Sequence, residues 1–244
     1  MTALRSLLFN LAFFGWTALV CVVALPMLVL PRGVLVRLAR LWARGTVLLL
    51  AALLDLRHEV RGDSPHPEAG AIYAFKHQSA WDTILLALLL RDPAIVLKKE
   101  LLAIPLFGWY LAKTGQIAID RRGGAKALKR MVRAAERCIQ AGRPLVIFPE
   151  GTRTAPGQHR PYLPGVAALY RQLALPVVPV ALNSGLFWPR RSFLKRPGLM
   201  TVEFLPAIEP GLSRQAFLDE LERRTEGACV RLNAAPEERP RGGR

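Results

Sequence analysis

The N-terminal region differs from the rest of the chain in its pattern of apolar and charged positions. Residues 6–31 carry no charged side chain, and a helix over them is long enough to cross roughly 30 Å of hydrocarbon. Pro26 is expected to kink this helix near its end. A segment with four arginines, residues 32–44, follows. A shorter apolar run, residues 45–56, comes next and is typical of a re-entrant, interfacial or packed segment. The pattern predicts a membrane anchor over residues 1–56, made of one long apolar helix and one short one.

From residue 57 onward, short apolar runs alternate with longer amphipathic segments. The predicted strands are residues 57–61, 71–75, 94–97, 116–119, 145–148, 177–182 and 199–204. The predicted helices are residues 81–90, 107–113, 125–141, 165–173 and 214–233. Alternation of this kind predicts an α/β fold, a largely parallel sheet covered by helices, preceded by the N-terminal membrane-associated segment. We therefore expect a catalytic domain over residues 57–233 and a disordered Pro-, Glu- and Arg-rich tail over residues 234–244.

Charge and composition narrow the range of partners. The formal net charge is +16, yet the chain is 52% hydrophobic, which argues against a soluble nucleic-acid-binding protein. The basic residues fit an anionic membrane surface, although a merely solvated basic surface explains them nearly as well. Because residues 6–31 are preceded by few cations and followed by several, the positive-inside rule places the domain on the cytoplasmic side of the cell (inner) membrane. Three distant cysteines and four scattered histidines predict neither a disulfide framework nor a metal site.

Residues 76–83 contain the most informative group of polar side chains. His77 and Asp82 follow an apolar strand-like run and precede an apolar helix-like run. In a strand-turn-helix geometry the two can meet at the carboxyl end of the strand, where open α/β sheets bind ligands. A carboxylate that orients an imidazole makes it a general base. The alternative is structural: Ser79 and Asp82 also match a capping box at the start of the helix.

A second polar loop, residues 148–154, follows the predicted strand 145–148. Gly151 allows the backbone to approach a ligand closely, and Arg153 can bind phosphate or carboxylate through two parallel hydrogen bonds. Glu150 can bind a hydroxyl group. Ordinary turn chemistry explains this loop, taken alone, about as well as ligand binding does.

The motifs together resemble those of the glycerolipid acyltransferases that acylate lysophosphatidic acid. The resemblance covers about residues 55–210 and keeps the family's order. The matching segments are the His-x4-Asp pair His77 and Asp82, the strand ending in Asp120 and Arg121, the sequence Phe-Pro-Glu-Gly-Thr-Arg at residues 148–153, and the Pro-containing apolar strand 177–182. Of these four segments, the sequence at residues 148–153 is the most specific to the family. One departure is Lys76, where many members carry asparagine, and it bears on substrate choice more than on chemistry.

The resemblance implies transfer of a fatty acyl group from acyl-CoA or acyl carrier protein to the sn-2 hydroxyl of lysophosphatidic acid, giving phosphatidic acid. His77 would act as the base and Asp82 would orient it. The implied substrate-binding residues are Glu150, Gly151, Thr152, Arg153, Arg121 and Lys76, with Lys98 a further candidate for the phosphate. The acyl donor is a co-substrate, and no cofactor or metal is expected. The sequence contains no Gly-x-Ser-x-Gly motif, so a covalent serine intermediate is not expected. An acidic carrier protein could dock on the basic helix 125–141.

The sequence leaves two alternatives open, one for the acceptor and one for the class of protein. Within the same family, the acceptor could be glycerol 3-phosphate, another lysophospholipid or a lyso-aminolipid. Outside it, the chain could be a non-catalytic module that binds anionic lipid, which would make His77 and Asp82 part of a helix cap only. That reading leaves the accompanying loop from Glu150 to Arg153 unexplained.

Overall fold

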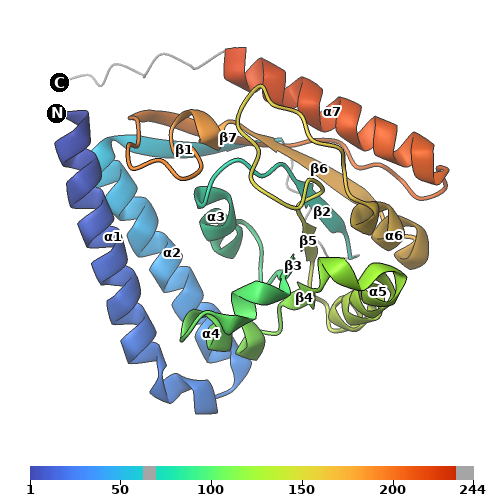
Figure 1. Ribbon diagram of the computed structural model, residues 1–244, viewed down its shortest axis with the longest axis horizontal. Helices are drawn as coiled ribbons and strands as arrows, with labels where there is room; N and C mark the ends of the chain where they lie inside the picture. The colour runs from blue at the N-terminus through green and yellow to red at the C-terminus, as the bar shows by residue number, and fades with distance from the viewer. Residues whose placement is uncertain (63–69, 235–244) are drawn as a thin grey trace.

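The computed structural model describes residues 1–62 and 70–234, and a mixed sheet forms their centre (Figure 1). Its strands are β1 (Leu56–Arg61), β2 (Ile72–Phe75), β3 (Ala94–Lys98), β4 (Ile117–Ile119), β5 (Leu145–Ile147), β6 (Val177–Leu182) and β7 (Gly198–Phe204). The order across the sheet is β1-β7-β6-β2-β5-β3-β4, and every neighbouring pair is parallel except β6 with β7. The predicted largely parallel sheet is confirmed, with β2 at its middle.

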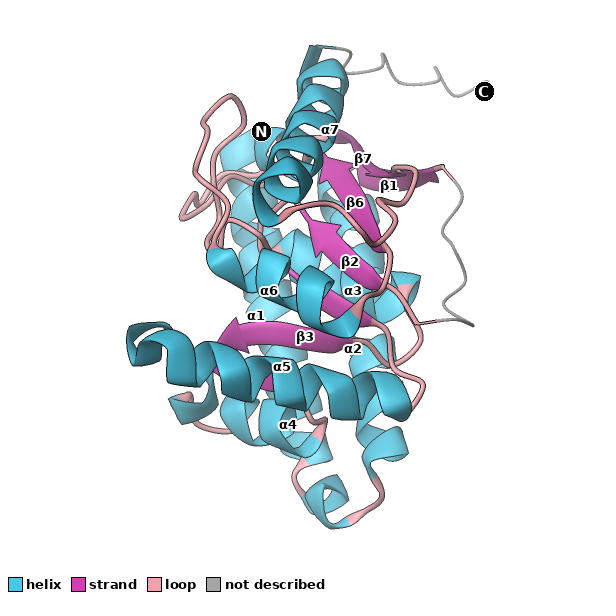
Figure 2. Ribbon diagram, turned by 90° about the vertical axis from the view of Figure 1, so that its right-hand side faces the viewer, coloured by secondary structure: helices cyan, strands magenta, loops and turns pink. Residues whose placement is uncertain are grey.

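Helices cover both faces of this sheet. They are α1 (Thr2–Ala24), α2 (Arg32–Leu54), α3 (Trp81–Leu89), α4 (Phe107–Lys113), α5 (Gly124–Gln140), α6 (Pro164–Leu173) and α7 (Arg214–Ala234). Figure 2 shows α5, α6 and α7 in front of the strands, whereas α1, α2 and α3 lie behind them. The predicted helices of the catalytic domain are all present, and their ends differ from the predicted ones by a residue or so.

Successive residues of each strand point to opposite faces, so the sheet separates two apolar cores. Tyr73 and Phe75 of β2 pack in the core that includes residues of α1, α2 and α3. Ile72 and Ala74 of the same strand pack in the core beneath α5, α6 and α7. Strands buried on both faces have no polar side and are therefore read in the sequence as nearly continuous apolar runs.

The N-terminal region forms a helical hairpin whose second arm differs from the prediction. α1 ends at Ala24, and a short 3₁₀ turn (η1, Pro26–Val29) reverses the chain. α2 then runs without a break from Arg32 to Leu54. The predicted bounds of the short apolar helix at residues 45–56 are thus wrong, since those residues up to Leu54 are the second half of α2. Its packing against the domain, one of the alternatives for this run, is present, because Leu50 and Leu54 belong to the core. The basic residues between positions 32 and 44 are good helix formers, and they belong to the same helix.

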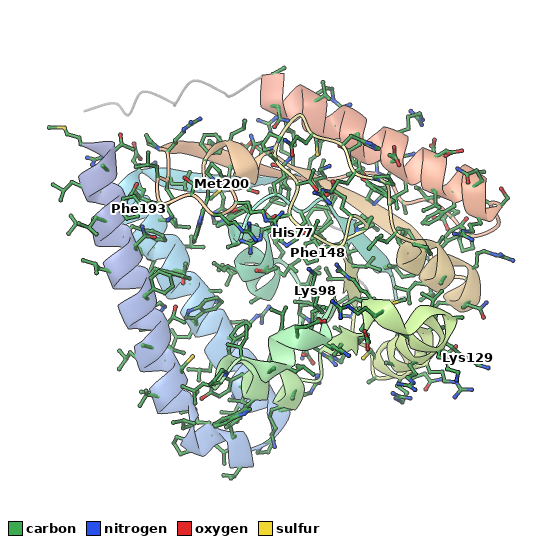
Figure 3. The ribbon with its side chains drawn as sticks, viewed as in Figure 1. His77, Lys98, Lys129, Phe148, Phe193 and Met200 are labelled. Carbon is green, nitrogen blue, oxygen red and sulfur yellow. The ribbon has the colours of Figure 1, made fainter. Side chains whose placement is uncertain are left out.

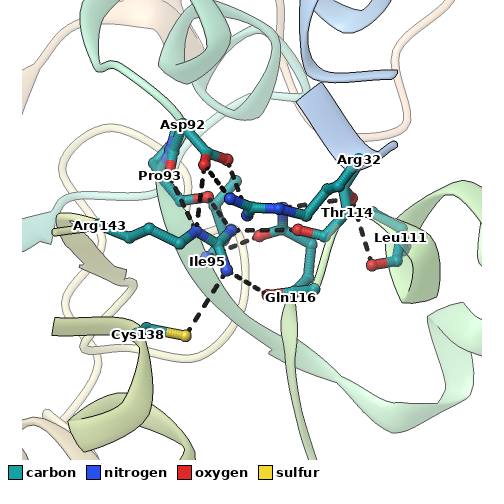
Figure 4. Close-up of polar contacts among 10 residues, drawn as sticks. Arg32, Asp92, Pro93, Ile95, Leu111, Thr114, Gln116, Cys138 and Arg143 are labelled. Carbon is teal, nitrogen blue, oxygen red and sulfur yellow. Dashed lines mark hydrogen bonds and ion pairs between the residues drawn. The ribbon is translucent and has the colours of Figure 1, made fainter. Parts of the chain in front are cut away.

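Specific contacts fasten the two helices to each other and both ends of the hairpin to the domain. The indole nitrogen of Trp16 in α1 donates to the backbone oxygen of Trp42 in α2 at 3.0 Å. At the start of α2, Arg32 donates to both carboxylate oxygens of Asp92, at 3.2 and 2.6 Å (Figure 4). Near the other end, the backbone nitrogen of Lys195 donates to the Ser6 hydroxyl at 3.0 Å. The hairpin therefore packs against the domain.

Asp92 belongs to a buried polar cluster that joins three loops of the domain (Figure 4). Arg143, only 6% exposed, donates to backbone oxygens of the segments before β3 and β4. Its guanidinium also lies 3.5 Å from Asp92, so the ion pair to α2 is continuous with the interior. The largest effect on the pKa of the Arg143 guanidinium is its burial, which lowers it, whereas the negative charge of Asp92 acts in the opposite direction.

α1 combines this docking with a largely exposed apolar surface. By length and composition it could cross a membrane: its most apolar window has a mean hydropathy of 2.1, and 11% of that window is buried. Its exposed large side chains include Leu4, Leu11, Phe14, Leu19 and Val22. The division at residue 56 between anchor and catalytic domain stays a prediction, as does the disordered tail, which lies outside the described residues except for Ala234 at the end of α7.

Candidate active site

The residues singled out in the sequence meet at one edge of the sheet, beyond the carboxyl ends of its parallel strands. His77 follows β2, and the loop at residues 148–154 follows β5. Lys98 ends β3, and Arg121 begins the 3₁₀ turn η3 (Arg121–Gly123) just after β4. Because the strands β2, β5, β3 and β4 are neighbours, these loops are brought together although 76 residues separate His77 from Arg153.

His77 and Asp82 form a hydrogen-bonded pair. His77 Nδ1 lies 2.9 Å from Asp82 Oδ2. The same oxygen accepts from the backbone nitrogens of Gln78 and Ser79, at 2.7 and 2.8 Å. An oxygen that already accepts two N–H bonds receives the third as an acceptor too, so Nδ1 carries the proton and Nε2 is left as the basic nitrogen. The His77 side chain is 14% exposed, whereas that of Asp82 is fully buried.

The helix-cap alternative is also present in the structure, and it does not compete with this pair. The Ser79 hydroxyl accepts from the backbone nitrogen of Trp81 at 3.2 Å, while Asp82 accepts from the backbone nitrogen of Ser79. These reciprocal bonds resemble a capping box and form a cap one residue ahead of Ala80, the N-cap residue of α3, which itself makes no side-chain cap bond. The other carboxylate oxygen of Asp82 accepts from the Ser184 hydroxyl, which follows β6. The cap thereby fixes the carboxylate that orients His77.

The loop after β5 packs directly on His77. The ring of Phe148 stacks on the imidazole with 4.1 Å between ring centroids (Figure 3). Further along, the backbone nitrogen of Thr154 donates to the backbone oxygen of His77 at 2.8 Å. Gly151 has φ +68°, and a Cβ there would lie 2.8 Å from the guanidinium of Arg121. The positive φ favours glycine here, and a larger residue would also have to displace the Arg121 guanidinium.

These side chains line a cavity of about 480 Å³ whose lining includes two chemically different groups of residues, called here its polar end and its apolar end. Its polar end contains His77, Lys98, Arg121, Thr152, Arg153 and Arg190. Its apolar end includes Val20 and Ala24 of α1, Leu35 and Trp42 of α2, and Phe107 and Leu111 of α4. The N-terminal hairpin therefore contributes a wall to the same cavity that contains His77, which the sequence pattern alone did not predict.

A sequence model of the Acyltransferase family matches residues 57–183. The chain belongs to this family. It is 38% identical over 185 residues to the 1-acyl-sn-glycerol-3-phosphate acyltransferase of Pseudomonas aeruginosa, covering 76% of this chain and 72% of that protein. It is 33% identical over 175 residues to the enzyme of the same name from Limnanthes alba, of which it covers 62%. The resemblance drawn from the motifs is confirmed.

The fold of this acyltransferase is also that of a solved structure. The crystal structure of the 1-acyl-sn-glycerophosphate (LPA) acyltransferase PlsC from Thermotoga maritima aligns with a TM-score of 0.79 and 20% sequence identity. The alignment covers 98% of this chain and 100% of that one, so the likeness extends to the N-terminal hairpin and to α7. At this identity the likeness supports the architecture.

The cations at the polar end of the acyltransferase cavity include one that the motifs did not indicate. Arg190, in the loop between β6 and β7, lines the cavity, and its Nη1 donates to the backbone oxygen of Arg153 at 3.2 Å. Burial lowers the pKa of the Arg153 guanidinium, and the like charge of Arg190 lowers it further. Two guanidinium groups that repel each other electrostatically at one cavity favour an anion between them. Arg190 belongs to no motif, and Ser184 was missed for the same reason.

Two of the predicted substrate-binding residues do not reach the cavity. Lys76 and Glu150 are buried, with 2% and 5% of their surfaces exposed, and pair with each other at 2.7 Å from Nζ to Oε1. Contact of Lys76 and Glu150 with the acceptor stays a prediction, and their burial away from the cavity lining does not favour it. Backbone alternation is the reason: Lys76 and His77 are consecutive at a strand end, so their side chains point to opposite sides.

Proposed function

We propose that the chain is a 1-acylglycerol-3-phosphate O-acyltransferase, which moves a fatty acyl group from a thioester to the sn-2 hydroxyl of lysophosphatidic acid and forms phosphatidic acid. The observation that carries the proposal is the place of the His77–Asp82 pair. The pair opens on a cavity whose lining contains both cationic and apolar side chains. Lysophosphatidic acid joins a phosphate and one acyl chain through a glycerol, so its free hydroxyl falls between the two ends.

The reaction needs a base, and His77 fits that role. Nε2 takes the proton of the sn-2 hydroxyl while the oxygen attacks the thioester carbonyl carbon. The Asp82 carboxylate, bonded to Nδ1, stabilises the imidazolium that forms. When the tetrahedral intermediate collapses, the C–S bond breaks and the imidazolium returns its proton to the departing thiolate. The products are phosphatidic acid and a free thiol, and His77 is regenerated as a neutral imidazole.

Arginines at the polar end would hold the acceptor phosphate. Arg153, Arg121 and Arg190 converge there together with Lys98. A phosphate monoester carries nearly two negative charges and three acceptor oxygens, which suits forked guanidinium donors. The apolar end would take the acyl chain of a substrate, which avoids about 0.8 kcal/mol of exposure to water for every CH₂ group.

The N-terminal helices suggest how a lipid acceptor reaches this cavity. α1 carries an exposed apolar surface on one side and lines the cavity on the other. We propose that α1 associates with the cell (inner) membrane and that the domain lies on its cytoplasmic face. The acyl chain can then pass from the leaflet to the apolar end while the head group moves toward His77.

We propose a CoA thioester or an acyl carrier protein thioester as the donor. The exposed face of α5 supports an acidic carrier, because it presents Lys126, Lys129, Arg130, Arg133 and Arg137. Within residues 1–62 and 70–234 no ion pair involves these five side chains, and Lys129 points outward from α5 in Figure 3. A carrier protein is acidic, so its docking there would gain from charge complementarity.

The test is an assay of the purified full chain in phospholipid vesicles with radiolabelled lysophosphatidic acid and each donor in turn. We expect phosphatidic acid to form, and His77→Ala to slow turnover by about 10²–10⁴-fold without loss of acceptor binding. His159→Ala is the matched control, because His159 is exposed and pairs with Glu222. No product with either donor, or a His77→Ala variant within a few-fold of wild type, would contradict the proposal.

A further inference from the structure

A buried ionic cluster lies behind the loop that follows β5. Lys76 Nζ is 2.7 Å from Glu150 Oε1, and 2.7 and 2.9 Å from the two carboxylate oxygens of Glu226. The side chains of Lys76 and Glu150 are 2% and 1% exposed, and that of Glu226 is 24% exposed. The Tyr162 hydroxyl donates to Glu226 Oε1 at 3.0 Å. One ammonium group is therefore shared by two carboxylates.

The cluster connects parts of the chain that are distant in sequence. Lys76 follows β2 at the centre of the sheet, Glu150 belongs to the loop after β5, and Glu226 lies in α7. α7 crosses the outer face of the sheet in Figure 1 and begins after residue 183, where the match to the family model ends. The helix that supplies Glu226 is thus outside the segment that contains every recognised motif.

Glu226 supplies what the other members of the cluster lack. A buried ammonium has three N–H donors, and Glu150 accepts only one of them. Burial alone would lower the pKa of Lys76, but hydrogen bonds from Nζ to Glu150 and Glu226 raise it above its ordinary value. Loss of Glu226 would leave Lys76 paired with Glu150 alone and two of its N–H donors without a carboxylate acceptor, and a buried donor without a partner is costly.

The loop held by this cluster forms one side of the active site. Glu150 is anchored inward, whereas Phe148 on one side of it stacks on His77 and Arg153 on the other side lines the cavity. Backbone bonds from Thr154 to His77 and from Leu163 to Pro149, and the bond from Arg190 to the backbone oxygen of Arg153, also fasten this segment to its surroundings. A shift of Glu150 would therefore move both the surface that packs on the imidazole and the guanidinium at the polar end.

We infer that Glu226 is a positioning residue for the acyl transfer: through Lys76 and Glu150 it holds the loop from Phe148 to Arg153 against His77. The inference rests on the proposed function, since it assigns a role within the same site. It also explains the lysine before the histidine. The ammonium group of Lys76 bridges the carboxylates of Glu150, in the loop, and of Glu226, in α7. The C-terminal helix thereby becomes part of the catalytic apparatus.

The first part of the test compares Glu226→Gln and Glu226→Ala with a control on the same helix. Glu222→Ala is that control, because Glu222 lies one turn away and pairs with the exposed His159. We expect kcat/KM for lysophosphatidic acid to fall by about 10-fold or more in Glu226→Ala and by less in Glu226→Gln, which keeps the shape and one acceptor oxygen. Glu222→Ala should match wild type.

The second part separates positioning from a general loss of stability. Glu226→Gln is combined with Arg153→Ala, and KM and kcat are measured for each of the four proteins. If Glu226 acts through the loop that carries Arg153, its effect on the KM for a phosphate-bearing acceptor shrinks once Arg153 is gone. The inference is overturned if Glu226→Gln changes KM equally with and without Arg153. It is also overturned if the Glu226 variants are as active as Glu222→Ala. Both outcomes presuppose an active wild type. An inactive wild type instead overturns the proposed function.

Discussion

Lys76 and His77 are neighbours in the chain, and each is bonded to a carboxylate, yet their surroundings differ completely. His77 lies on the wall of a cavity, and its ring keeps one nitrogen free of protein partners within the described residues. Lys76 points to the opposite side of the strand end and is enclosed by Glu150 and Glu226. Its three N–H donors are matched by three short contacts with carboxylate oxygens.

The difference shows that ion pairing alone does not mark a catalytic group. A base must keep one site open to the substrate, as His77 Nε2 does, while the rest of the group is fixed. A structural pair does the reverse and satisfies every donor, since a buried polar group without a partner costs about 1–3 kcal/mol. The two pairs share a carboxyl-terminal strand end, so perturbing each should give a different kind of defect.

The largest expected effect comes from the pair that faces the cavity. Asp82→Asn removes the charge that stabilises the imidazolium and weakens control of the tautomer, so kcat should fall by about 10²–10⁴-fold. Ser184→Ala removes only the hydroxyl that donates to the other Asp82 oxygen and should cost far less. Steady-state kinetics measures kcat for each variant, and thermal unfolding shows whether the variant is folded. A folded Asp82→Asn protein with nearly normal kcat would show that the carboxylate only caps α3.

A smaller effect is expected at the polar end of the cavity. Arg153→Ala should raise KM for a phosphate-bearing acceptor by about 10- to 100-fold, because a charged hydrogen bond contributes roughly 1.5–3 kcal/mol. Arg153→Lys should restore only part of the affinity, since a point charge replaces a planar fork. An acceptor without phosphate serves as the comparison, and Arg223→Ala on α7 as the control variant. Equal losses for both acceptors would assign Arg153 to the donor or to the fold.

Much of the architecture could be predicted from the sequence, because each element carries its own local signal. The strands are apolar on both faces, and α5 separates apolar from basic positions so clearly that its bounds differ from the prediction by one residue at each end. The motif at residues 148–153 is long enough to identify the family. α2 was missed because a helix that docks by one face and carries arginines on another contains no single apolar run.

The candidate site was predictable only for residues inside a motif. His77 and Asp82 were predicted and lie 2.9 Å apart, although their catalytic roles stay a prediction. Arg190 and Ser184 come from loops after β6 that no local pattern marks, and only the topology of the sheet brings them to the site. The pairing of Lys76 with Glu226 could not be predicted, because a contact between residues 150 positions apart leaves no trace in local sequence.

The smallest expected effect comes from the buried cluster around Lys76. It is a change in the free energy of unfolding with pH. The pKa of Lys76 is raised above its ordinary value of 10.5. A raised pKa in the folded state means that the ammonium stabilises the fold fully below about pH 10.5, and that this contribution is lost as the pH rises through the folded value. Lys76→Met has no such contribution to lose. It should be less stable than wild type at pH 8, and the difference in unfolding free energy should shrink above pH 10.5.

Denaturant unfolding of both proteins in detergent between pH 8 and 12 measures that difference. Tyr162 touches the same cluster, and burial raises the pKa of its phenol, so a Tyr162→Phe background removes a second group that titrates in alkali. The alkaline decrease should remain in that background if it belongs to Lys76. A stability gap that stays constant across the range would mean that the ammonium adds nothing to the fold. The side chains of Lys76 and His77 would then differ only in the side of the strand end to which they point. The inference that the buried cluster holds the loop would be contradicted.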